Sequence, residues 1–193
     1  MPDYNQLREL CKKGSRISGA VIDDFLIYYG AKQDRVDREF ELRLSRFRHG
    51  IGSMPANWAG LIKAQYIGHR IFKQNGLIAK YLKHAAIKDL VPEEQNYLRQ
   101  RAAHPWRFSF SEIKANPAND FYEMADVFTG HTYLLYSIST TQILSERPVL
   151  LWLNLIGFNG ECWETYGPIT GLQSFNADDI FFYATELDPS IES

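Results

Sequence analysis

Acidic side chains in the last third of the chain are the first candidates for chemistry. Glu161 and Glu164 lie close together, and Asp178 and Asp179 are adjacent. Two carboxylates can serve as general acid and general base when one keeps its proton at neutral pH and the other does not. However, Asp178 and Asp179 also fall in the first turn of an expected helix, where negative charge offsets the helix dipole. We therefore assign no catalytic residue, and a hydrolase-like enzyme with a carboxylate site is kept as the second alternative function.

A basic stretch between residues 32 and 49 could bind phosphate groups. Its cations are Lys32, Arg35, Arg38, Arg43, Arg46, Arg48 and His49. Such a stretch could follow the backbone of RNA or DNA, with Phe40 or Phe47 nearby to stack on bases. Acidic residues are interleaved at spacings that pair charges on a helix, so a solvated, ion-paired helix face explains the same pattern. Arg43, Arg46 and Arg48 are therefore candidate binding residues, and nucleic acid is an alternative partner that the interleaved acids disfavour.

The histidines and cysteines form no recognisable metal or redox motif. The five histidines lack the spacings that place two ligands on one helix face, and neither Cys11 nor Cys162 has a second cysteine nearby in the sequence. We expect no metal site and no cofactor. Each cysteine is interpreted as a small buried hydrophobic residue, which suits a reducing compartment such as the cytoplasm.

Glycine-rich phosphate loops and the Gly-x-Ser-x-Gly motif of hydrolases are also absent from the sequence. Aromatic residues, in contrast, are abundant in the second half, and Trp106 and Trp163 are among them. Because a small β-rich domain cannot bury them all, we expect some to form an exposed surface or a contact between the halves. Trp106 and Trp163 are thus candidate binding residues. The leading hypothesis is a non-catalytic binding or interaction protein, whose partner is another protein or a second copy of the chain.

Charge divides the chain into two parts. Residues 1–103 hold 18 Lys and Arg against 11 Asp and Glu, a net charge of +7, whereas residues 104–193 hold 3 against 12, a net charge of −9. The hydrophobic period changes from helical to alternating at the same boundary. We therefore predict a basic helical domain, 1–103, and an acidic β-rich domain, 104–193. Docking of the two halves is favoured over binding to an outside polyanion, because the whole chain carries a net charge of −2.

No segment of the sequence is typical of a membrane protein. The first twenty residues lack the continuous apolar run of a signal peptide. The most apolar run, residues 149–158, is about half as long as the ~20 residues that a membrane-spanning helix requires. We expect a soluble cytoplasmic protein with no membrane partner.

Helical periodicity covers most of the first half. Asp3 is expected to cap a short helix that stops at Gly14, and a second helix is expected to end at Gly30. Residues 32–49 fit either a helix or a strand, and we choose the helix because the stretch contains no Gly or Pro. Further helices are predicted over residues 55–75, 77–90 and 92–103.

Two hairpins and a final helix are predicted in the second half. The hairpins join 121–128 to 132–138 across Gly130, and 149–158 to 161–166 across Asn159-Gly160. Asn176 is expected to cap a helix over 177–187. Four or five strands with short turns are typical of a small, partly closed barrel. The expected fold class is α+β, with a helical N-terminal half followed by a small antiparallel β-barrel-like C-terminal half and a terminal helix.

One segment of the chain also resembles a known group of proteins. The residues that carry the resemblance are Pro92-Glu93-Glu94, Tyr97-Leu98, Pro105, Phe108, Phe110, Glu112, Asp126-x-x-Thr129-Gly130, Ser137-x-Ser139 and the strand before Asn159-Gly160. From Pro92 to roughly Leu172 the chain resembles a module of uncharacterised bacterial proteins, some of which also carry a SEC-C type metal-binding motif. That cysteine-rich motif is absent here. The resemblance therefore implies a barrel-like fold, and it implies neither a metal role nor an activity.

Overall fold

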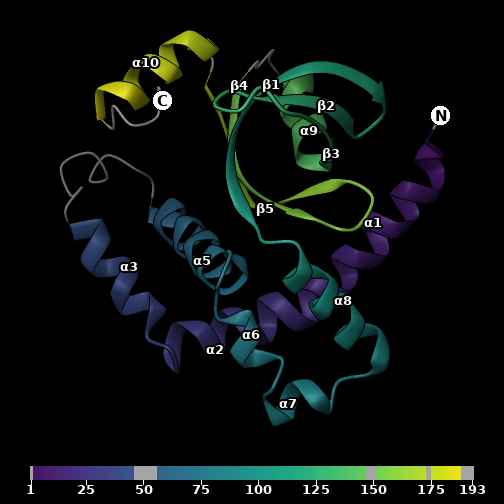
Figure 1. Cartoon of the computed structure of the whole chain (residues 1–193), viewed down its shortest axis with the longest axis vertical. Coiled ribbons are helices and arrows are strands. Elements are labelled where there is room, and N and C mark those ends of the chain that lie inside the picture. Colours follow the sequence, from purple (N-terminus) through teal and green to yellow (C-terminus); the bar gives the residue numbers. More distant parts are fainter. Residues whose placement is uncertain (1, 46–55, 147–150, 173–174, 188–193) are drawn as a thin grey trace.

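The computed structural model describes residues 2–45, 56–146, 151–172 and 175–187. Helices make up the first half of the chain, five strands form a mixed sheet in the second half, and a helix follows the sheet (Figure 1). The predicted α+β class, the helical first half and the terminal helix are confirmed. Within the described residues, no helix is both long and apolar enough to cross a membrane.

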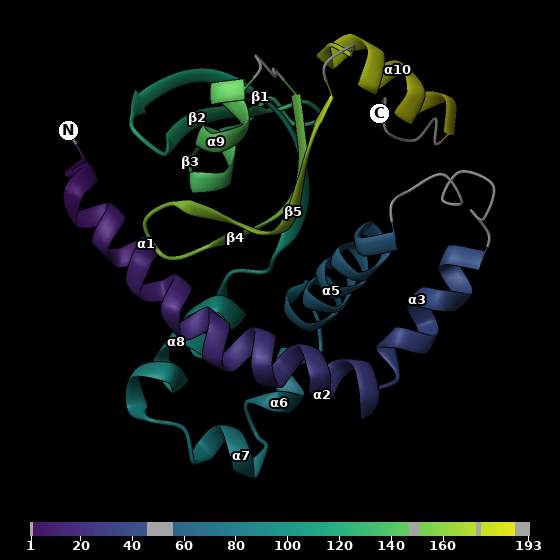
Figure 2. The same cartoon turned by 180° about the vertical axis from the view of Figure 1, so that it is seen from behind.

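The N-terminal helices form one continuous rod (Figure 2). The rod consists of α1 (Tyr4–Ser18), the π-helical segment η1 (Gly19–Leu26) and α2 (Ile27–Lys32). Asp3 caps it as predicted, because its Oδ1 accepts the backbone N–H of Asn5 at 3.0 Å. The predicted stop at Gly14 is wrong, since α1 continues through this residue. Packing of α1 against other elements outweighs the weak helix preference of a single glycine.

Gly30 lies inside α2, so the stop predicted there is wrong as well. It is buried where α2 approaches α5 (Ala56–Phe72). A Cβ atom on Gly30 would lie 3.2 Å from the side chain of Ile71 and 3.3 Å from that of Ile67. The glycine therefore permits a close approach of two helices and does not terminate one. The left-handed residue that follows the rod is Arg35, with a φ of 55°.

Shorter helices complete the first half. They are α3 (Val36–Leu44), α5 (Ala56–Phe72), α6 (Ile78–Tyr81), α7 (Ala85–Lys88) and α8 (Pro92–Ala103). The choice of helix within residues 32–49 is confirmed for 36–44, and residues 46–49 lie outside the described part. The single helix predicted over 77–90 is wrong. His84 adopts an extended backbone between α6 and α7, and its Nδ1 accepts the N–H of Ala86 at 3.3 Å, which starts a new helix.

The sheet closes on itself. Its strands are β1 (Arg107–Ala118), β2 (Phe121–Asp126), β3 (Thr132–Tyr136), β4 (Leu151–Phe158) and β5 (Trp163–Leu172). They lie in the order β1-β2-β3-β5-β4, and β4 pairs again with β1. Four of these pairs are antiparallel, whereas β3 and β5 run parallel, with Leu135 opposite Trp163. The prediction of a wholly antiparallel sheet is therefore wrong at this pair.

An unpredicted helix explains the parallel pair. Helix α9 (Ile138–Glu146) follows β3 directly and separates it from β4. Strand β4 pairs with β1 and not with β3, so the place beside β3 is filled by β5. The sequence 137–146 lacks a strong helical stripe, and the strand predicted over 132–138 ends at Tyr136 instead.

The predicted turns are confirmed. β2 and β3 pair across Gly130, which has a φ of 67°, and β4 and β5 pair across Gly160, which has a φ of 99°. Both values lie in the left-handed region that favours glycine. Helix α10 (Ala177–Leu187) begins as predicted, because the Oδ1 of Asn176 accepts the N–H of Asp179 at 2.9 Å.

The largest buried apolar cluster of the described residues extends across the boundary between the two halves. It joins buried residues of the helices, such as Ile71 and Leu98, to Trp106 and to Leu155 of β4. Two smaller clusters lie around Met124 and around Phe121. The helices and the closed sheet are therefore packed against each other.

Candidate functional site

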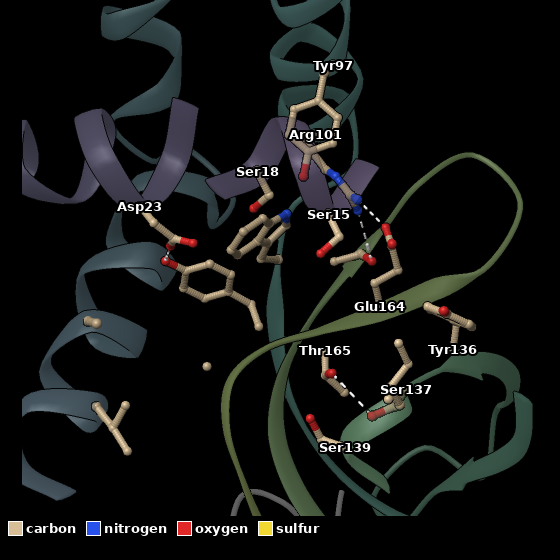
Figure 3. A pocket seen from close by; sticks show the side chains of 17 residues that line it. Ser15, Ser18, Asp23, Tyr97, Arg101, Tyr136, Ser137, Ser139, Glu164 and Thr165 are labelled. Atoms are coloured by element: carbon tan, nitrogen blue, oxygen red, sulfur yellow. Dashed lines mark hydrogen bonds and ion pairs between the residues drawn. The ribbon is translucent and has the colours of Figure 1, made fainter. Parts of the chain in front are cut away.

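A cavity of about 430 Å³ lies where the N-terminal rod, α5 and α8 meet the closed sheet (Figure 3). The rod contributes the side chains of Ser15, Ser18 and Asp23, and α8 contributes Tyr97 and Arg101. On the sheet side the lining comes from β5, from Gly157 of β4 and from the junction of β3 with α9. Both halves of the chain are thus needed to form the cavity.

An ion pair between the halves forms one wall of the cavity. Arg101, which is only 3% exposed, donates through Nη2 to the Glu164 carboxylate and through Nη1 to the carbonyl of Gly157 at 3.3 Å. Its guanidinium carbon lies 4.9 Å from the centre of the Tyr97 ring. Burial alone would lower the pKa of Arg101, but Tyr97 and the Glu164 carboxylate outweigh it and raise the pKa. Arg101 therefore stays charged inside the protein.

A second contact between the halves joins Asp23 of η1 to Tyr166 of β5. The Tyr166 hydroxyl donates to Asp23 Oδ1 at 2.5 Å, and the ring packs against Trp106 with centroids 4.9 Å apart. Burial and the neighbouring Asp23 carboxylate raise the pKa of Tyr166, so the phenol remains protonated at neutral pH. Asp23 itself is exposed at the edge of the cavity.

Hydroxyl groups line much of the remaining surface. Ser15 and Ser18 approach from the rod, and Ser137, Ser139 and Thr165 approach from the sheet side (Figure 3). Ser137 caps α9, because its Oγ accepts the N–H of Thr140 at 3.2 Å. The N-terminus of α9 therefore lies in the cavity wall. Such a lining can donate hydrogen bonds to a polar molecule and accept them from it.

The charged groups of the lining are two carboxylates and one guanidinium, so negative charge exceeds positive. Two buried donors in the same wall, Arg101 Nε and Trp106 Nε1, have no hydrogen-bond acceptor within the described residues. Among those residues, no group of three or more His, Cys, Asp and Glu side chains lies close enough to hold a metal ion. The arrangement offers recognition of a polar molecule by hydrogen bonds and charge.

The structure places Arg43, one of the three candidate arginines, away from this cavity. Arg43 lies on α3, where it forms an ion pair of 3.3 Å with Glu39 of the same helix. Glu39 also pairs with Arg70 of α5 at 3.2 Å, so Arg43 belongs to a network that joins two helices of the first half. Docking of the halves uses Arg101 with Glu164 and Arg8 with Asp120 instead. Arg46 and Arg48 lie outside the described residues.

The two candidate tryptophans occupy different surroundings. Trp106 is buried between the halves, where it stacks on Phe72 at 4.3 Å between centroids. Trp106 also lines the cavity between the halves. Trp163 is half-buried on β5, and the guanidinium of Arg107 lies 5.2 Å from its ring. It does not line the cavity.

Of the four carboxylates considered for acid and base chemistry, only Glu164 lines the cavity. Glu161 lies in the turn before β5, where its N–H donates to Asn159 Oδ1 at 3.0 Å. Asp179 accepts the N–H of Asn176 at 3.0 Å and so helps to begin α10. Nothing in the described part of the chain brings these groups together as a catalytic pair.

Four residues of the cavity lining are not among the candidates predicted from the sequence: Asp23, Tyr97, Arg101 and Tyr166. A signal for two of them was present. Tyr97 and Arg101 are four residues apart on α8 and share a face with Leu98, and all three are buried. An arginine on the apolar face of a helix indicates a buried partner for its charge.

Comparison of the chain with models of protein families, with curated proteins and with solved structures finds no match. The case for a function therefore rests on the cavity and its lining.

Proposed function

We propose that this protein is a non-catalytic binding protein that holds a small polar molecule in the cavity between its two halves. The observation that carries the proposal is a cavity of about 430 Å³ whose lining combines hydroxyl groups, two carboxylates and a buried arginine. Its volume lies within the range of ~300–1,000 Å³ that is common for small-molecule sites. The closed sheet, which we interpret as the small barrel expected from the sequence, supplies one rigid wall, and the helical rod supplies the other.

The charge of the lining suggests the class of ligand. Arg101 is already neutralised by Glu164, whereas Asp23 accepts only the neutral hydroxyl of Tyr166 among its described contacts. An anionic ligand would meet the uncompensated charge of Asp23. A neutral or cationic molecule rich in hydroxyl or amino groups would instead form hydrogen bonds with the serine and threonine side chains. We therefore propose a polyhydroxyl or amine-bearing ligand without net negative charge.

Binding is favoured over hydrolysis because both carboxylates of the cavity are engaged. Glu164 accepts from Arg101, and Asp23 accepts from Tyr166. General base catalysis would require one of these carboxylates to take a proton while it keeps its contact with the protein. The hydroxyls of Ser137 and Thr165 lie 3.4 Å apart, and Ser137 is also committed to capping α9. This pattern supports recognition without a covalent step.

The proposal is tested by screening the full chain against four classes of probe: neutral polyols, amino sugars, diamines and sugar phosphates. Thermal shift and ligand-observed NMR are the measurements. We expect binding from the neutral or cationic classes and none from the sugar phosphates. Asp23→Asn should weaken binding of a cationic probe by about fivefold and leave a neutral probe unchanged, since it removes one exposed charge.

A second test fills the cavity with a large side chain and compares it with the same substitution outside the cavity. Ser139 is exposed at the cavity wall, so Ser139→Phe should abolish binding without disturbing the core. Ser45 is exposed at the end of α3, and Ser45→Phe should leave binding intact. Binding that survives in Ser139→Phe, or a preference for the sugar phosphates, would overturn the proposal.

A further inference from the structure

The two cysteines, which are far apart in the sequence, are in contact in the folded protein. Cys11 lies on α1 and Cys162 lies in the turn before β5, and their Sγ atoms are 3.6 Å apart. Both are free thiols and almost fully buried, with exposed fractions of 0% and 1%. A disulfide requires the two sulfurs to approach to about 2.05 Å. The two sulfurs are therefore already in contact at the atoms that would bond.

Asn159 positions both sulfurs. Its side-chain amide donates to Cys11 Sγ at 3.3 Å and to Cys162 Sγ at 3.6 Å. Its Oδ1 accepts the backbone N–H of Cys162 at 2.8 Å, which fixes the turn that carries this cysteine. Its carbonyl in turn accepts from Gln100 of α8. The thiol pair is therefore held by contacts from α1, α8 and the β4–β5 turn.

We propose that Cys11 and Cys162 form a reversible disulfide when the protein meets a peroxide, so that the pair is a redox-active dithiol. The Cys162 thiolate attacks one oxygen of hydrogen peroxide, the O–O bond breaks, and the leaving hydroxide takes the former thiol proton to become water. The Cys11 sulfur then attacks the resulting sulfenic sulfur and expels a second hydroxide, which becomes water with the proton of Cys11. Two thiols lose two electrons and two protons, and one peroxide becomes two waters.

The surroundings give the two sulfurs different roles. The hydrogen bond between the thiols lowers the pKa of Cys162, burial opposes this, and the Asn159 amide lowers it further. The same hydrogen bond raises the pKa of Cys11, and burial adds to the increase. Because the thiolate is the nucleophile, we assign the attack to Cys162 and the resolving step to Cys11.

A second cavity, of about 450 Å³, lies near the pair. It lies between α1 and α8, and its wall includes Leu10 and Gly14, which flank Cys11 in sequence, and Asn159, whose amide contacts both sulfurs. Glu164 and Arg101 line this cavity and the first one. A disulfide would thus join α1 to the sheet beside the ion pair that both cavities share.

The test exposes the full chain to hydrogen peroxide and counts free thiols by alkylation, and peptide mapping by mass spectrometry locates any crosslink. We expect loss of both thiols, a linked peptide that contains Cys11 and Cys162, and full recovery with a dithiol reductant. The bond closes a long loop, so the Tm should rise by roughly 5–10 °C on oxidation. Cys11→Ser should show no such rise with peroxide.

The variant Asn159→Asp tests whether Asn159 positions the two sulfurs. Aspartate suits the same turn before glycine and keeps the acceptor for the Cys162 N–H, but it removes the amide donor and adds negative charge beside the sulfurs. Disulfide formation should therefore slow several-fold, and the buried carboxylate should also lower the Tm of the reduced protein. Two thiols that both stay free at peroxide levels that oxidise glutathione, or crosslinks only between chains, would overturn the proposal.

Discussion

Arg101 of α8 and Glu164 of β5 form a buried ion pair across the junction of the helical half and the closed sheet. The two residues line both of the cavities described above. The pair therefore lies between these cavities, and it also connects the helical half to the sheet.

Breaking this ion pair on one side is expected to destabilise the protein strongly. Glu164→Gln leaves the buried charge of Arg101 without a counter-charge, and the free energy of unfolding should fall by about 3–5 kcal/mol. Urea unfolding followed by circular dichroism measures the change. The double variant Arg101→Met with Glu164→Leu removes both charges and should recover most of the loss. If the double variant is no more stable than Glu164→Gln, the uncompensated charge is not the cause.

The hydrogen bond between Tyr166 and Asp23 is expected to couple the rod to the sheet. A double-mutant cycle with Tyr166→Phe and Asp23→Asn should give a coupling of about 1 kcal/mol, because the bond has a charged acceptor but lies near the surface. Chemical unfolding of the four proteins provides the values. Tyr136→Phe serves as the control with Asp23→Asn, since the Tyr136 hydroxyl has no hydrogen-bond partner in the described structure, and this pair should show no coupling.

Acid stability is expected to depend on Asp126. Burial alone would raise its pKa, but hydrogen bonds from Arg107 at 2.7 Å and from the backbone of Thr129 at 3.1 Å outweigh burial and lower it. The carboxylate therefore stabilises the fold above the unfolded pKa of about 3.9, and this stabilisation is lost as the pH falls through the lower folded-state pKa.

The measurement for Asp126 is the free energy of unfolding as a function of pH. Asp126→Asn should reduce stability by about 2 kcal/mol at neutral pH, and the difference from the unmodified chain should shrink toward pH 2. Glu123 is exposed on the same strand, β2, and Glu123→Gln should leave the profile unchanged. A difference that stays constant over the whole range would contradict the linkage.

The close contact of Gly157 with Trp106 is expected to exclude any side chain at this position. A Cβ on Gly157 would lie 2.4 Å from Trp106 Nε1, so Gly157→Ala should destabilise the protein by about 1–3 kcal/mol. A Cβ on Gly19 would have no neighbour within 4 Å, and this residue has helical backbone. Gly19→Ala should therefore stabilise the protein by roughly 0.5–1 kcal/mol. Thermal unfolding distinguishes the two outcomes.

Features governed by neighbouring residues could be predicted from the sequence. Asn159-Gly160 defines a tight turn because glycine tolerates a positive φ, and Asn176 caps α10 through a side chain only a few residues from its acceptor. Both signals involve residues within one turn of each other. The helical first half, the hairpins and the α+β class followed from such local patterns.

The tertiary structure decided what depended on distant contacts. Gly14 and Gly30 are typical of helix ends in the sequence. In the structure both lie inside helices, because these helices pack against other helices. No local pattern indicates that β5 runs parallel beside β3. Cys11 and Cys162 are each isolated in sequence, and only the docking of α1 on the β4–β5 turn brings their sulfurs into contact. Such pairings arise because burial of apolar surface and neutralisation of buried charge act between residues that the fold brings together, whatever their separation along the chain.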